Sequence, residues 1–205
     1  MYGLRVSRLR SIRPKDWSGE DPVRTALIGG IGNVLLGDDG VGPYVVRILE
    51  SMYDFESEVE IIDLGTPALD LTHQIVGLKA LLLVDSVASE DPAGSLALYT
   101  KEDILRDTPA ERLDPHSPAL AECLMTAAML GAMPEHVLLV GISGKCYEPG
   151  HPLSAAVRQS VGPAIEAILQ ELQRLGFKYQ KKIAPDEPGI WWSDHEHAST
   201  AETLG

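Results

Sequence analysis

Residues 27–42, LIGGIGNVLLGDDGVG, constrain the fold of this chain more than any other stretch. The stretch opens with a short apolar run of strand character and continues through closely spaced glycines. Apolar residues then recur at helical spacing over residues 44–52. Asp38 and Asp39 precede this helix, where the helix dipole favours negative charge. The stretch therefore predicts a strand-to-helix connection with two acids, at the edge where parallel sheets bind ligands.

Three simpler interpretations of this stretch exist. One of the two acids could only cap the helix, which requires no function. The glycines could form a dinucleotide-binding loop, but Leu35 stands where the third glycine of that fingerprint belongs. The acids could also lie in a solvated turn. Because adjacent carboxylates repel each other and a cap needs only one, the pair favours a functional role.

Strand and helix patterns alternate along the rest of the chain. Apolar runs predict strands at residues 58–64, 79–84, 95–100 and 136–142. Helices are predicted after Thr66-Pro67, from Ser117 to Gly131 and over residues 153–175, whereas residues 101–116 read as polar and irregular. This order predicts an α/β fold, a three-layer sandwich around a twisted, mostly parallel sheet of about five strands. Residues 95–100 are expected to be antiparallel or at an edge.

The length of 205 residues suits a single domain with a full hydrophobic core. Residues 1–24 contain six Arg or Lys side chains and two prolines, and they read as an N-terminal extension. The α/β domain is expected to cover residues 25–177. Residues 178–205 mix charged, proline and small residues, and we expect them to form a polar C-terminal tail outside the core.

Charge and composition limit the partners of this chain. The net charge is −13, which predicts against binding to nucleic acid because phosphates would be repelled. No apolar run is long enough for a bilayer, and the N-terminus lacks the apolar core of a signal peptide. Cys123 and Cys146 have no zinc-site spacing. We therefore expect a cytoplasmic protein without membrane partners, and a monomer by default.

Acidic residues recur where predicted strands end. Asp63 and Asp85 each follow a strand, as the pair Asp38 and Asp39 does, and His116 lies between two prolines just before a helix. Carboxylates and an imidazole that converge at this edge would form an incomplete ligand set for a divalent metal. The alternatives are that Asp85 caps the next segment, that Asp63 bonds its own turn, and that His116 is an ordinary surface histidine.

Four motifs occur in a fixed order: GIGNVLLGDDGVG, IIDLGT, LLLVDSV and DPHSP. Together they resemble the nickel–iron hydrogenase maturation endopeptidases over roughly residues 25–176. This resemblance implies a twisted α/β sandwich and three metal ligands, which correspond to Asp39, Asp85 and His116. Asp63 resembles a family position implicated in cleavage or substrate engagement, and Asp38 is assigned to the same catalytic group in a supporting role.

The resemblance also implies an activity, the removal of a C-terminal peptide from the precursor of a hydrogenase large subunit after nickel insertion. The nickel would be supplied by the substrate, and no organic cofactor is expected. Two carboxylates and an imidazole suit completion of a shell that the partner partly provides. The sequence departs from the family at Asp39, where some members have glutamate, and at Ala68, where a glycine often follows the Gly-Thr pair.

Two other classes share parts of this pattern. A phosphoacceptor receiver-like signalling domain has an acid pair, an aspartate after its third strand and a late lysine, for which Lys145 would serve. The acid pair here lies well beyond the strand, however, and the histidine loop has no role in that scheme. Peptidyl-tRNA hydrolases begin with a similar stretch, but Val34-Leu35 replaces their proline-glycine and the net charge opposes tRNA binding.

Overall fold

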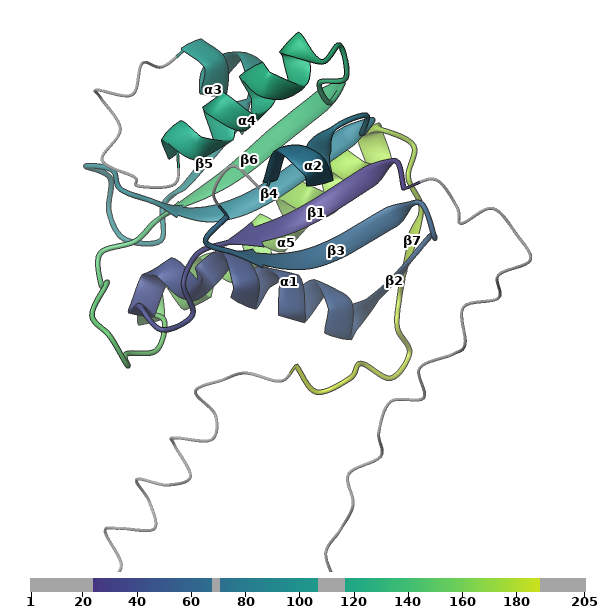
Figure 1. Cartoon of the computed structure of the whole chain (residues 1–205). Coiled ribbons are helices and arrows are strands. Elements are labelled where there is room, and N and C mark those ends of the chain that lie inside the picture. Colours follow the sequence, from purple (N-terminus) through teal and green to yellow (C-terminus); the bar gives the residue numbers. More distant parts are fainter. Residues whose placement is uncertain (1–23, 68–70, 107–116, 189–205) are drawn as a thin grey trace, which may run out of the picture.

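The computed structural model describes residues 24–67, 71–106 and 117–188. Its centre is a five-stranded sheet in the order β3-β1-β4-β6-β5 (Figure 1). The strands are β1 (Ala26–Ile31), β3 (Val59–Gly65), β4 (Ala80–Val87), β5 (Leu96–Thr100) and β6 (His136–Ser143). β1 is parallel to β3 and β4, β4 is parallel to β6, and only β5 is antiparallel to its neighbour within this sheet. The predicted α/β class and the antiparallel edge strand are confirmed.

Helices cover both faces of this sheet (Figure 1). One face packs against α1 (Val41–Met52) and α5 (Ala155–Arg174), and the other against α2 (Leu71–Ile75), α3 (Lys101–Arg106) and α4 (Ser117–Met129). Successive strand residues serve opposite faces: Leu82 joins the α1–α5 core, whereas Leu81 and Leu83 join the other. Because β4 is buried on both faces, its sequence is a continuous apolar run until it reaches the acid.

Glycines place the start of α1 directly on the sheet. A methyl group at Gly42 would collide with the carbonyl oxygens of Ile31 and Val84, and one at Gly30 would collide with the Gly42 carbonyl. Only a hydrogen atom fits between these backbones, so the glycines of this motif allow the start of α1 to pack directly against β1 and β4. The motif holds α1 and the short 3-10 helix η1 (Gly37–Gly40) before it against the carboxyl ends of β1 and β4.

Two parts of the chain differ from the sequence-based expectations. Neither Thr66 nor Pro67 is helical, and the described helical residues begin at Leu71, so the predicted helix start is wrong. Helix α3 lies in a stretch expected to be irregular. Thr100 and Asp103 cap it reciprocally: the Asp103 carboxylate accepts from Thr100 N at 2.9 Å, and Asp103 N donates to Thr100 Oγ1 at 3.3 Å.

A second, two-stranded sheet joins β2 (Tyr53–Phe55) to β7 (Tyr179–Lys181) in antiparallel pairing. The rings of Tyr53, Phe55 and Tyr179 pack together, with centroids 5.8–6.2 Å apart. The folded part of the chain therefore extends past residue 177, where the sequence suggested that a polar tail begins. Among the described residues, the structure contains no helix with the length and apolar character needed to cross a membrane.

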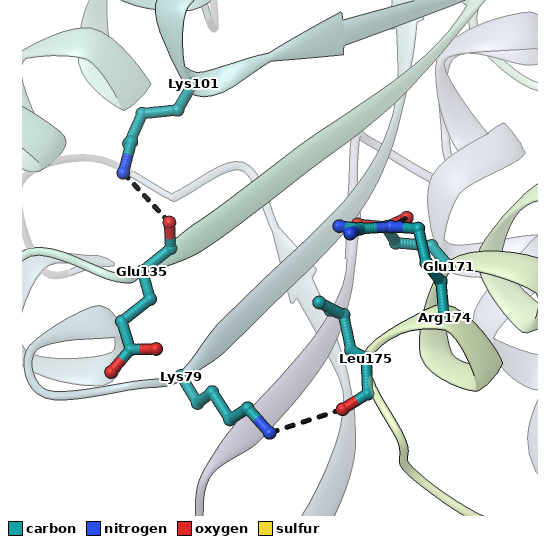
Figure 2. Close-up of polar contacts among 6 residues, drawn as sticks. All are labelled: Lys79, Lys101, Glu135, Glu171, Arg174 and Leu175. Carbon is teal, nitrogen blue, oxygen red and sulfur yellow. Dashed lines mark hydrogen bonds and ion pairs between the residues drawn. The ribbon is translucent and has the colours of Figure 1, made fainter.

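Lys79 caps the C-terminus of α5 at the amino edge of the sheet (Figure 2). Its Nζ donates to the Leu175 carbonyl at 3.2 Å and lies 5.1 Å from the centroid of the Phe177 ring. A cation at this position stabilises the last carbonyls of a helix and the face of an aromatic ring. Lys101 makes a similar contact nearby, donating to the Glu135 carbonyl at 2.9 Å.

Lys79→Met removes the charge but keeps the aliphatic stem, so it should lower the free energy of unfolding by about 1 kcal/mol. For a domain of this size that corresponds to a fall in Tm of roughly 2–4 °C. Thermal unfolding measures the change. Lys178→Met is the matched control because the Lys178 side chain is exposed and its ammonium group forms a surface ion pair with Glu56, at 3.4 Å. Equal melting temperatures for both variants would contradict the capping role.

Glu171 and Arg174 form a bidentate ion pair on α5, with both N–O distances at 2.7 Å (Figure 2). The hydrogen bonds from Arg174 hold the pKa of the Glu171 carboxyl below its ordinary value. A depressed pKa in the folded state contributes stability that is complete above the unfolded pKa and lost as pH falls through the folded one. Glu171→Gln should therefore be slightly less stable than the parent at neutral pH and equally stable in acid.

Urea unfolding from neutral to acidic pH measures this difference. The Arg174→Gln background is the control, because Glu171 then has no guanidinium partner and the Glu171→Gln change should show no such pH dependence. A stability difference that persists unchanged in acid would contradict the assignment.

Candidate active site

Asp39 lies in η1, directly before α1, and its side chain is nearly buried. Its Oδ2 accepts a hydrogen bond from Asn33 N at 2.7 Å, and Asn33 Oδ1 in turn accepts from Leu35 N at 3.0 Å. The loop can fold back this closely because Gly32 has a φ of +134°, and a side chain there would collide with the Asp39 carbonyl. The loop thus orients the Asp39 carboxylate at the carboxyl edge of the sheet.

Asp85 lies near the carboxyl end of β4 and is 2% exposed. Val84 is in register with Gly30 of β1, so Asp85 lies just beyond the point where the β1–β4 pairing ends. The η1 segment that contains Asp39 packs against β4. Two nearly buried carboxylates, Asp39 and Asp85, therefore come from segments in contact at the predicted edge.

His116 lies outside the described residues. It directly precedes Ser117, the first residue of α4, which packs on the face of the sheet that Leu81 and Leu83 serve. By strand alternation Asp85 belongs to that same face. The other end of α4 leads to the amino end of β6, so the Ser117 end is directed toward the carboxyl edge (Figure 1).

Asp38 is completely buried and holds another loop in place. Its Oδ2 accepts hydrogen bonds from the backbone N–H groups of Lys145 and Cys146, both at 3.0 Å, and its Oδ1 accepts from Ser154 N at 2.7 Å. The Asp38 N–H also donates to the Cys146 carbonyl at 2.7 Å. These contacts bind the β6–α5 loop and the N-cap of α5 to Asp38. Asp38 therefore positions these segments beside Asp39.

Asp63 is exposed near the end of β3, beside β1 in the sheet. Its Oδ1 accepts a hydrogen bond from Gly65 N at 3.0 Å, in a turn where Gly65 has a φ of +59°. The alternative that Asp63 bonds its own turn is therefore observed. The side chain nevertheless lies at the same edge as Asp39 and Asp85 and remains accessible to a large substrate.

Within the described residues, no group of three or more His, Cys, Asp or Glu side chains is arranged to hold a metal ion. The predicted ligand set contributes two described members, Asp39 and Asp85. Sequence reasoning did not link Ser86 and Tyr147: the buried Ser86 hydroxyl lies 3.1 Å from the exposed Tyr147 hydroxyl, and by strand alternation Ser86 faces the side of the sheet opposite to Asp85. No sequence pattern links these two residues, because the strands β5 and β6 and the helices α3 and α4 lie between them in the chain.

Lys145, the lysine that a receiver-like domain would use, directs its ammonium group to the Ser89 carbonyl. Its backbone N–H is bound to Asp38. The hydrogen bond to the Ser89 carbonyl fixes the Lys145 side chain against the loop that follows β4.

Comparison with known proteins gives a consistent assignment. The family model for the hydrogenase maturation protease HycI matches residues 43–171. The hydrogenase 2 maturation protease of Escherichia coli K12 is 29% identical over 150 residues, which cover 73% of this chain and 92% of that protein. The hydrogenase expression/formation protein HupM of Azotobacter chroococcum is 32% identical over 151 residues, covering 73% and 72%.

Solved structures agree with these relatives. The hydrogenase maturating endopeptidase HybD of Escherichia coli superimposes with a TM-score of 0.71 at 27% identity, over 77% of this chain and 97% of that one. The receiver-like alternative is not favoured by this match. Since the family model spans more than half of the sequence, and the strand order places the motif acids at one edge, this chain belongs to the hydrogenase maturation protease family and is an endopeptidase.

Proposed function

We propose that this endopeptidase removes a C-terminal peptide from the nickel-loaded precursor of a nickel–iron hydrogenase large subunit. The family assignment supports the substrate class. One structural observation supports the site: Asp39 and Asp85, 7% and 2% exposed, lie on contacting segments at the carboxyl edge of the sheet. Burying a carboxylate costs free energy, and a divalent cation brought by the substrate would offset part of that cost.

The donor types suit the proposed ligand set. Asp39 and Asp85 would supply carboxylate oxygens and His116 an imidazole nitrogen, a set that matches a borderline metal such as nickel. Nickel bound to the precursor would supply a Lewis acid for the scissile carbonyl. Asn33 orients the Asp39 carboxylate through its backbone N–H, so this ligand is preorganised before the substrate arrives.

The other two acids take different roles in this proposal. Asp63 is exposed at the same edge and would engage the peptide or its attacking water, whereas Asp38 acts through the loop that it holds. We further propose that the protein acts as a cytoplasmic monomer without an organic cofactor, and without nucleic acid or membrane partners. The net charge of −13 supports the exclusion of nucleic acid.

Incubation of the purified chain with nickel-loaded and nickel-free precursor tests this function. Mass spectrometry of the released peptide should show cleavage of the loaded precursor only, because the free precursor lacks the ion that Asp39 and Asp85 recognise. Equal cleavage of both forms would overturn recognition through nickel. Cleavage of neither form, with a panel of large-subunit precursors, would overturn the proposed substrate.

A further inference from the structure

An apolar groove runs along the solvent side of the seam between α1 and α5. Its volume is about 720 Å³, within the range of pockets that hold a drug-sized ligand. Helix α1 and helix α5 supply its walls, and the second sheet closes one end. The apolar residues that line it include Tyr44, Ile48, Met52, Ile165, Leu169 and Tyr179. We call this feature the α1–α5 groove.

The chain itself returns to this groove after β7. Lys182 N donates to the Met52 carbonyl at 2.8 Å, and Asp186 N donates to the Ser51 carbonyl at 3.0 Å. The backbone thus crosses the C-terminal end of α1, beside a residue that lines the groove. Residues 183–187 are exposed, but Pro188, the last described residue, is half-buried again. The chain is therefore held beside the Met52 end of the α1–α5 groove at Asp186, two residues before the described part ends.

The sequence that follows is suited to fill an apolar groove. Residues 190–192, Ile-Trp-Trp, form the most apolar run between residue 178 and residue 205. Trp191 lies five residues after Asp186, which gives a reach of roughly 17 Å at about 3.4 Å per residue. The part of α1 between Ser51 and Tyr44 is about 10 Å long at 1.5 Å per residue. Both tryptophans can therefore reach the part of the groove that α1 lines, between Met52 and Tyr44.

We propose that residues 190–192 dock in the α1–α5 groove of the same chain, with the two indole rings against its aromatic and aliphatic walls. A buried indole removes a large apolar area from water, which is the main driving force for such docking. The groove lining contains one basic residue, Arg158, at its far end and one acidic residue, Glu166, nearer its middle. Asp194 and Glu196 follow the tryptophans, so a segment that runs from Met52 toward Arg158 would carry its acids past Glu166 to the basic end.

Docking would attach the C-terminal segment to both α1 and α5. The N-terminal ends of these helices adjoin the acid pair, because α1 follows Asp39 and Ser154, the N-cap of α5, is bound to Asp38. The inference rests on the groove and the path of the chain, so it stands independently of the substrate proposed above.

Gly162 offers a test in the full-length protein. It lies on α5 in the lining of the groove, and a Cβ atom there would meet nothing within 4 Å, so the helix accepts a side chain at this position. Gly162→Phe would fill the groove with a ring, whereas Gly162→Ala leaves it open and is the matched control. Both are made in a Trp17→Phe background, which leaves Trp191 and Trp192 as the only tryptophans.

Tryptophan emission and quenching by iodide report whether the indoles are buried. In the Gly162→Ala protein we expect emission at shorter wavelength, and weaker quenching, than in the same protein unfolded in urea. In the Gly162→Phe protein both values should move to those of the unfolded chain, while circular dichroism shows the fold unchanged. If Gly162→Phe unfolds the chain, Arg158→Glu serves as the second variant and should increase quenching.

Three outcomes would overturn the proposal. Solvent-exposed indoles in the Gly162→Ala protein would show that the segment does not dock. If the emission and quenching of buried indoles stay the same in both Gly162→Phe and Arg158→Glu, the indoles are buried elsewhere on the molecule. Burial that disappears on dilution would show that the groove binds the segment of a second copy.

Discussion

Asp85→Asn should reduce cleavage of the nickel-loaded precursor about 100-fold or more, the order of loss that follows removal of one preorganised electrostatic contact at a reacting centre. Asparagine keeps the shape of the side chain but lacks the negative charge that a cation requires. Because β4 buries residue 85 almost completely, no other described side chain can take its place without movement of the strand.

Initial rates of peptide release measure the effect, and thermal unfolding shows whether the fold survives. Asp39→Asn should behave in the same way, since its carboxylate is nearly buried and is oriented by Asn33. Asp91→Asn is the matched control, because Asp91 is an exposed aspartate on the loop after the same strand. Full activity in Asp85→Asn would remove Asp85 from the ligand set.

Asp38→Asn should cost roughly 3 kcal/mol of folding stability, a fall in Tm of about 6–12 °C for a domain of this size. Both carboxylate oxygens of Asp38 accept backbone hydrogen bonds. An asparagine side chain has only one acceptor oxygen, so its NH₂ group must face either Ser154 N or the N–H groups of Lys145 and Cys146. At least one buried donor is then left opposite another donor.

Urea unfolding measures this loss, and activity should fall with it because the loop after β6 loses its anchor. Asp63→Asn is the control: it weakens one hydrogen bond in an exposed turn and should change stability by less than about 1 kcal/mol. Wild-type stability in Asp38→Asn would show that these backbone contacts contribute nothing.

The layout of the sheet and the acids at its carboxyl edge could be predicted because both depend on local patterns. A strand buried on both faces is continuously apolar, and its first charged residue marks the approach of its carboxyl end, as Asp85 does two residues before β4 ends at Val87. The helix α3 was predictable in principle, since Thr100 and Asp103 form a recognisable capping pair.

Other features depend on contacts that no local pattern reveals. Asp38 finds its partners 107 to 116 residues later in the chain, so its sequence position suggested chemistry and not an anchor. The pairing of β2 with β7 joins two three-residue strands across most of the domain. The sequence argued against a dinucleotide-binding loop at Gly30 but gave no other reason for the glycines. That reason, contact between the backbones at Gly30 and Gly42, appears only when β1 and α1 are packed together.

The anchor at Asp38 has a consequence for how the protein is made. The amides that neutralise this buried carboxylate belong to Lys145, Cys146 and Ser154, which leave the ribosome long after the acid itself. Until they emerge, burial of Asp38 carries the full desolvation cost of a charge. The nascent chain therefore cannot complete the surroundings of Asp38 until Ser154, the residue that caps α5, has been translated.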